Sequence, residues 1–138
     1  MKFALAFLFL GTMCTAMAQN PLRDFRWSNR LLVFSVPEES IKTGEWQSGF
    51  EEQSKELAER DLLLLTVVGN KVFLSEKLTD LSAKALLDFF QLRRSEILLI
   101  GKDGGVKGRW THAVSPLEVY RLIDSMPMRQ AEMRSGRD

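Results

Sequence analysis

Few side chains in this chain have the chemistry for catalysis. It has one cysteine, Cys14, and one histidine, His112. A lone histidine cannot form a metal site, and no acidic residues stand at metal-ligand spacing around it, so we interpret it as a loop residue and expect no metal or other cofactor. Ser40 could act as a nucleophile only beside a base. Because serine is a preferred N-cap residue, we favour a helix cap at that position.

Two groups of basic residues form a candidate surface for an anion or a protein partner. The first group is Lys102, Lys107 and Arg109, preceded by Arg93 and Arg94. We favour the simpler interpretation that these charges protect an exposed sheet edge, with an anion-binding patch as the alternative. The second is the C-terminal stretch, where arginines alternate with methionines as they do in many interfaces. Methionines packed onto the domain would also explain that pattern. The candidate surface comprises Lys102, Lys107, Arg109, Met128, Arg129 and Arg134.

The first residues have the pattern of a secretory signal peptide. Lys2 provides a positive start, residues 3–10 are apolar, and Ala16-Met17-Ala18 is a small-x-small cleavage site. We therefore predict a signal peptide at residues 1–18 and a single domain at residues 19–138. Cleavage would remove Cys14 and leave an exported, periplasmic or secreted protein that has no thiol and no stable insertion in a membrane.

Charge and length narrow the classes of protein further. The chain has 19 Lys and Arg against 18 Asp and Glu, and removal of Lys2 would balance the two. This neutrality argues against nucleic acid as a partner, because nucleic-acid-binding domains carry a strongly basic face. About 120 residues ordinarily form one domain with one core.

These residues must be positioned by two apolar strands, one β-hairpin and three helices. Residues 30–36 and 62–68 are continuous apolar runs typical of buried strands, and residues 71–75 are a weaker third candidate. Helices are predicted at residues 49–59, where Gly49 begins the firm part, and at residues 79–93, with Thr79 or Ser82 as N-cap. A further helix opens at Ser115-Pro116-Leu117-Glu118, a capping-box pattern, and is interrupted at Pro127.

A β-hairpin is the most specific local prediction. The apolar strand 96–101 and the strand 106–110 flank Lys102-Asp103-Gly104-Gly105, in which one glycine is expected at positive φ. The resulting order is strand, helix, strand, helix, hairpin, helix. A right-handed crossover makes the first two strands parallel, and the hairpin adds antiparallel strands, so we predict an α/β fold of thioredoxin-like order with a mixed sheet and flanking helices.

Several motifs resemble a known family, the peroxiredoxin-like domain of unknown function called P-DUDES. The resemblance spans residues 19–138 and lies in Trp27-x-x-Arg30-Leu31-Leu32-Val33-Phe34, Arg60-Asp61-Leu62, Ile100-Gly101-Lys102-Asp103-Gly104-Gly105-Val106-Lys107 and Met126-Pro127-Met128-Arg129-Gln130-Ala131-Glu132-Met133-Arg134. That family includes bacterial exported proteins and domains of vertebrate extracellular matrix and sushi-repeat proteins. The resemblance implies the peroxiredoxin branch of the thioredoxin-like fold and brings no agreed catalytic residues.

Comparison with peroxiredoxins places a candidate ancestral pocket after the first strand. Peroxiredoxins carry their attacking cysteine there, at a helix N-terminus and near an arginine. This chain has Glu38, Glu39 and Ser40 instead, and its arginine counterpart is Arg93 or Arg94. We therefore expect a non-catalytic binding or interaction module whose partner is an unidentified protein or anionic ligand. The alternative is an enzyme with redox or hydrolytic activity in that pocket.

Overall fold

A computed structural model describes residues 18–37 and 43–136, and Glu38, Glu39 and Ser40 lie outside these ranges, as does nearly all of the predicted signal peptide. Within the described residues, six strands form one mixed sheet in the order β4-β3-β2-β1-β5-β6. The strands are β1 (Arg30–Val36), β2 (Leu62–Val68), β3 (Lys71–Leu74), β4 (Lys77–Leu78), β5 (Glu96–Ile100) and β6 (Val106–Trp110). No described helix is both long and apolar enough to span a bilayer.

The pairing of the strands confirms the predicted topology. β1 pairs in parallel with β2 and antiparallel with β5, and β5 pairs antiparallel with β6. β1 occupies the centre, and all seven of its residues are buried, as expected for an apolar run covered on both faces. β3 confirms the weaker strand prediction, whereas the two-residue β4 had no apolar run to signal it.

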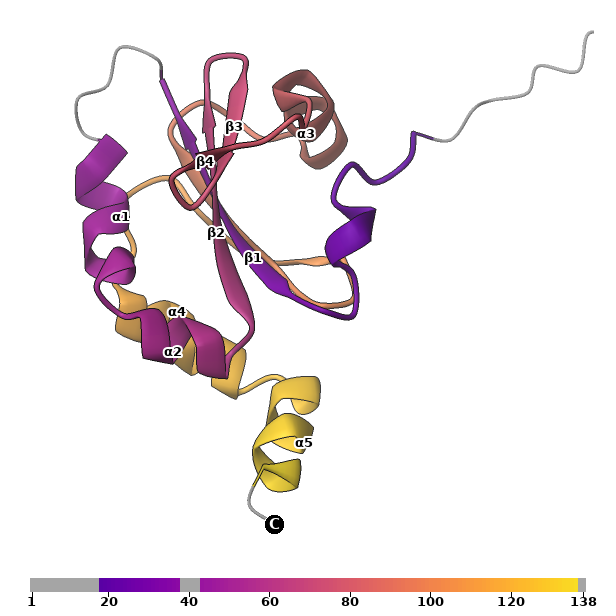
Figure 1. Ribbon diagram of the computed structural model, residues 1–138, viewed down its shortest axis with the longest axis vertical. Helices are drawn as coiled ribbons and strands as arrows, with labels where there is room; N and C mark the ends of the chain where they lie inside the picture. The colour runs from indigo at the N-terminus through magenta and orange to yellow at the C-terminus, as the bar shows by residue number, and fades with distance from the viewer. Residues whose placement is uncertain (1–17, 38–42, 137–138) are drawn as a thin grey trace, which may run out of the picture.

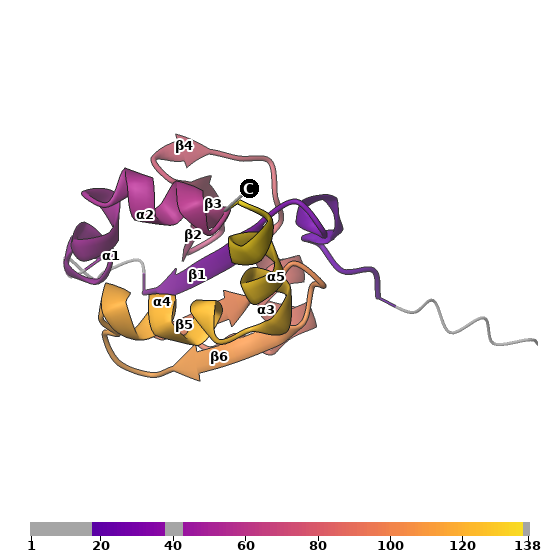
Figure 2. The same ribbon diagram turned by 90° about the horizontal axis from the view of Figure 1, so that it is seen from below.

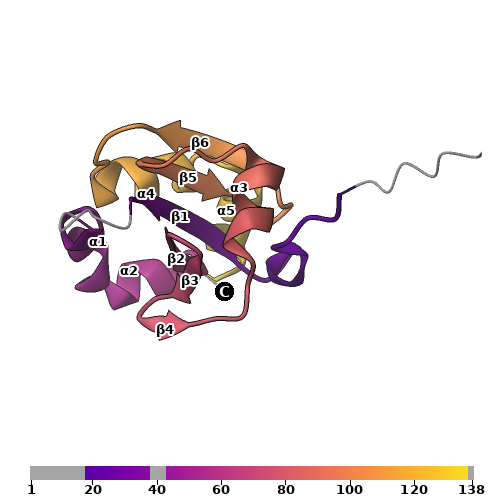
Figure 3. The same cartoon turned by 90° about the horizontal axis from the view of Figure 1, so that it is seen from above.

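Helices cover both faces of the sheet (Figures 1 and 2). α1 (Thr43–Glu51), α2 (Ser54–Glu59) and α4 (Pro116–Asp124) lie on one face, where Phe34, Phe50 and Tyr120 pack edge to face. α3 (Ala83–Phe90) covers the other face and packs Leu86 and Phe90 against β1 and β2. The 3₁₀ helix η1 (Arg23–Phe25) precedes β1, and Figure 3 shows α3 on the sheet face. Phe25 of η1 and the neighbouring Leu22 pack in the core beneath α3.

Two predicted helices differ from those observed. The helix predicted at residues 49–59 is two helices, because Gln53 leaves the helical conformation at φ −113° and ψ 46° between α1 and α2. The helix predicted at residues 79–93 is shorter. Ser82 is its N-cap, while the Thr79 hydroxyl donates to the Val72 carbonyl, and Gln91 ends the helix in the left-handed conformation.

Local predictions at the other turns are confirmed. Gly104 has φ +84° in the turn between β5 and β6. The Ser115 hydroxyl accepts a hydrogen bond from the Glu118 amide, which caps α4. The Glu118 carboxylate accepts instead from the Trp110 indole, so the reciprocal half of the capping box is replaced by a tertiary contact. α5 (Pro127–Ser135) begins at the proline predicted to interrupt α4.

Candidate functional sites at the two ends of the central strand

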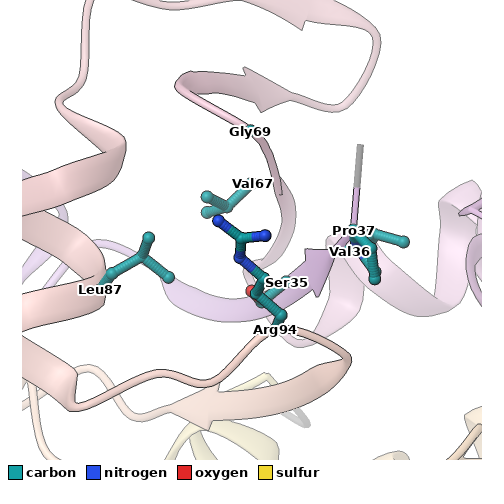
Figure 4. Close-up of a pocket in the computed structure, with 7 residues that line it drawn as sticks. All are labelled: Ser35, Val36, Pro37, Val67, Gly69, Leu87 and Arg94. Atoms are coloured by element: carbon teal, nitrogen blue, oxygen red, sulfur yellow. The ribbon is translucent and has the colours of Figure 1, made fainter. Parts of the chain in front are cut away.

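A small cavity lies at the carboxyl end of β1, next to the predicted ancestral pocket. Its volume is about 80 Å³, and it is lined by residues of β1, β2, α3 and the segment before β5: Ser35, Val36, Pro37, Val67, Gly69, Leu87 and Arg94. Figure 4 shows the guanidinium of Arg94 reaching across the cavity toward Val67, with Leu87 on one side. The cavity therefore combines one cation with a mostly apolar wall.

The chain between α3 and β5 separates Arg94 from Arg93. Gln91 and Ser95 both have positive φ, and the Arg93 amide donates to the Glu96 carboxylate, so the segment makes tight local turns. Arg93 consequently lines a different depression, beside Arg109. Of the two candidate counterparts of the peroxiredoxin arginine, Arg94 is the one at the cavity. Within residues 18–37 and 43–136, no ion pair involves it.

The other hairpin cations have partners within the domain. Arg109 lies 3.0 Å from the buried carboxylate of Glu96 and donates to the Phe90 carbonyl at the end of α3. Lys107 pairs with Asp103 at 2.8 Å on the surface. Its hydrogen bond and that of the Gly105 amide hold the pKa of the Asp103 carboxyl below its usual range. Both ion pairs lie within the hairpin, and the hydrogen bond from Arg109 to Phe90 joins the hairpin to α3.

An ion-pair network occupies the opposite end of β1. The guanidinium of Arg30, which is 1% exposed, donates to both carboxylate oxygens of Glu132, at 3.1 and 3.2 Å. Lys102 Nζ lies 2.7 Å from the same carboxylate and 2.8 Å from that of Asp61. The topology brings these residues together, because β1 and β2 begin at this end and the antiparallel β5 finishes there.

A second half of the network joins α4 and α5 to the start of β2. Asp124, at the end of α4, accepts hydrogen bonds from Arg60 at 2.8 and 3.0 Å and from Arg129 at 3.1 Å. Arg129 also donates to the Glu59 carbonyl, and Arg60 pairs with Glu56. The Arg60 guanidinium is 4.5 Å from the ring centroid of Tyr120. The network therefore holds α5 against the domain (Figure 1).

The network shifts the pKa values of its members. Burial raises the pKa of the Asp124 carboxyl, but the hydrogen bonds from Arg60 and Arg129 outweigh it, and the pKa lies below its usual range. Glu132 behaves in the same way, with burial opposed by Arg30 and Lys102. For Lys102, burial lowers the pKa of the ammonium group, but its two carboxylate partners raise that pKa by a larger amount. The pKa of Lys102 therefore lies above its usual range.

Burial changes the interpretation of two members of the candidate surface. Lys102 is 9% exposed and Arg129 is 8% exposed, so neither side chain lies on an open surface. The prediction that Lys102 lies on a solvated sheet edge is therefore wrong. Both were predicted as surface cations because sequence offers no sign of their distant partners. Lys107, Arg109 and Met128 are exposed, as is Arg134. Whether they bind anything stays a prediction.

All four sequence motifs of the predicted resemblance meet in this network. Each contributes charged members: Arg30 from the first, Arg60 and Asp61 from the second, Lys102 from the third, and Arg129 and Glu132 from the fourth. Only Asp124 and Glu56 come from outside them. Long sequence motifs that offered no catalytic residues thus indicated a network of ion pairs that stabilises the fold.

His112 lies exposed in the loop after β6. In the part of the chain that the structure describes, no group of three or more His, Cys, Asp or Glu residues is arranged to hold a metal ion.

The parallel β1 and β2, the antiparallel β5–β6 hairpin and helices on both faces define a thioredoxin-like domain. A family model described as Domain of unknown function (DUF4174) matches residues 21–132, and the chain belongs to this family.

Two further proteins are similar to the chain. Coiled-coil domain-containing protein 80 of Danio rerio is 28% identical over 140 residues, and the match covers 83% of this chain and 16% of the relative. The chain thus spans less than a fifth of that protein. A solved structure described as the crystal structure of Trgpx in apo form has 23% identity and a TM-score of 0.48, over 74% of this chain and 82% of that one.

Proposed function

We propose that this chain is an exported, non-catalytic binding domain of the P-DUDES type, and that the cavity at Arg94 receives a carboxylate or similar small anion of its partner. The observation that carries the proposal is the placement of Arg94. Its guanidinium enters a cavity of about 80 Å³, and within residues 18–37 and 43–136 the other side chains that line it carry no charge. That volume has room for a few water molecules or one carboxylate group.

The chemistry of the lining favours binding over catalysis. Arginine presents a fork of N–H donors that matches a carboxylate, and it stays charged at any physiological pH. Among the described residues that line the cavity, Ser35 supplies the one hydroxyl, and none of them is a histidine, cysteine or acidic residue that could activate it.

Titration with sodium acetate tests the site directly. In ¹⁵N NMR spectra of the protein from residue 19 onward, we expect saturable shifts of the Arg94 Nε–H and Gly69 amide signals. Arg94→Gln should abolish them, because the cavity loses its cation. Arg93→Gln is the matched control and should preserve them, since Arg93 lines a different depression. Equal responses in the two variants, or shifts no larger than those caused by sodium chloride, would contradict the proposal.

Activity assays separate the binding proposal from the enzymatic alternative. The protein from residue 19 onward has no cysteine, so we expect it to reduce neither hydrogen peroxide nor insulin disulfides above a buffer blank. The measurement is peroxide consumption and insulin turbidity in the presence of dithiothreitol. Turnover that scales with protein concentration and survives removal of contaminating thiol enzymes would make the chain an enzyme.

A further inference from the structure

A groove of about 410 Å³ lies at the end of the domain opposite Arg94. The turn of the β5–β6 hairpin (residues 101–103) and Lys107 form one side, and the start of α5 (residues 126–128) forms the other. This size falls within the range of roughly 300 to 1,000 Å³ seen for small-molecule sites. The groove is separate from the Arg94 cavity, since the two share no lining residue.

Apolar side chains dominate the α5 side of the groove. Met126 packs against the core, and Met128 is 40% exposed although it is a large apolar residue. Methionine adapts its shape to a bound group because its side chain is unbranched and flexible. This side of the groove therefore suits an aliphatic chain.

The hairpin side offers one cation with free hydrogen-bonding capacity. Arg30 and Lys102 also line the groove, but both are buried and are neutralised by Glu132 and Asp61. Among the described residues, Lys107 pairs only with Asp103, and both of these side chains are partly exposed. An ammonium group has three N–H donors, so two remain on Lys107 for a ligand. An exposed ion pair such as Lys107–Asp103 contributes about 1 kcal/mol or less to stability. Asp103 therefore competes only weakly with a bound anion for Lys107.

We propose that this groove binds a small amphipathic carboxylate, with its aliphatic tail on Met126 and Met128 and its carboxylate on the ammonium group of Lys107. The assignment rests on the free N–H donors of the exposed Lys107 ammonium group at one side of the groove and on exposed, adaptable apolar surface at the other. It is independent of the function proposed for Arg94.

Octanoate is the probe, used below its micelle-forming concentration with the protein from residue 19 onward. Amide signals of Asp103, Lys107 and Met128 should shift and saturate in ¹⁵N NMR titrations. Octan-1-ol has the same tail without the charge, and we expect it to bind about fivefold more weakly, the equivalent of one exposed ion pair. Octylammonium should bind more weakly than octanoate, because its ammonium group cannot accept a hydrogen bond from Lys107 and is repelled by it.

Two variants and their matched controls locate the site. Lys107→Gln should weaken octanoate binding about fivefold, whereas Lys84→Gln, which removes another exposed i,i+4 pair, should not change it. Met128→Ser should weaken binding by a similar factor through lost apolar contact. Its control is Leu117→Ser, because Leu117 follows Pro116 at the start of α4 as Met128 follows Pro127 at the start of α5, and both are exposed. Thermal melts confirm that each variant is folded.

Several results would overturn the assignment. The first is octanol binding as tightly as octanoate. The second is weakening by the control variants as much as by the groove variants, or no saturable shift at all. The third is tighter binding of an acetylated peptide ending in a free leucine carboxylate, which would make the ligand a protein C-terminus. Octanoate shifts confined to Arg94 and Gly69 would also exclude the groove while supporting the separate cavity.

Discussion

Gly104 is the residue most constrained by its own conformation. Its φ of +84° is strained for any residue with a Cβ. A Cβ added there would also lie 3.2 Å from Asn20 Nδ2 and 3.3 Å from the aliphatic part of Arg26. A residue with a Cβ would therefore be strained by its backbone conformation and would displace side chains of the segment before β1, some 80 residues away.

Gly104→Val should therefore lower the free energy of unfolding by about 1 to 2 kcal/mol, the cost of a left-handed conformation for a residue with a Cβ. Urea denaturation followed by circular dichroism measures the loss. Gly105→Val is the control, because Gly105 is not at positive φ and its nearest neighbour is the flexible side chain of Asp103. If both variants lose the same stability, the constraint is not the conformation of Gly104.

At the scale of elements, α5 is held by charge more than by apolar packing. Its only buried residue is Arg129, and the helix contacts the sheet through Glu132, Arg30 and Lys102. Helices of globular domains usually dock through an apolar stripe. The position of α5 therefore depends on ion pairs that have good geometry and little solvent around them.

Glu132→Ala should destabilise the protein by about 3 kcal/mol, because it leaves the buried guanidinium of Arg30 without its carboxylate. Chemical denaturation gives the loss, and amide hydrogen exchange should show α5 opening before the sheet. Asp88→Ala is the matched control. It breaks the exposed Lys84–Asp88 pair and should change stability by less than about 1 kcal/mol. Similar losses in both variants would mean that Glu132 does not anchor α5.

At the scale of the whole molecule, the network makes stability depend on pH. The pKa values of Asp124 and Glu132 lie below their usual ranges, so near those ranges the folded protein binds fewer protons than the unfolded chain. This stabilisation is present above the ordinary pKa values of about 4 and is lost as pH falls through the folded values. For Lys102, whose pKa is raised, stabilisation is present below its ordinary pKa and is lost as pH rises through the folded value.

We therefore expect the free energy of unfolding to fall steeply as pH decreases from 5 toward 2, measured by urea denaturation at each pH. Glu132→Gln removes one of the two carboxyls of the network whose pKa values are lowered and should make that decline shallower. An equally steep decline in the variant would place the acid sensitivity elsewhere in the molecule.

The sequence by itself determined the elements whose causes are local. Continuous apolar runs are sufficient for β1, β2 and β5, because a strand buried on both faces needs apolar residues at every position. Gly104 and the Ser115-Pro116 pair fix a turn and a helix start through their own backbone preferences. The order of these elements then led to the topology, since crossovers are right-handed and hairpins are antiparallel.

Only the tertiary structure decided which charged side chains form ion pairs and which cavities they line. Arg30 and Glu132 are 102 positions apart in sequence, and Lys102 is 41 positions from Asp61, so no local pattern pairs them. The same holds for Arg93 and Arg94, which are adjacent in sequence yet line different depressions because the turn before β5 separates them. Ion pairs and cavities form between side chains that only the tertiary fold brings together. Residue type and spacing in the sequence do not predict which of them will be in contact.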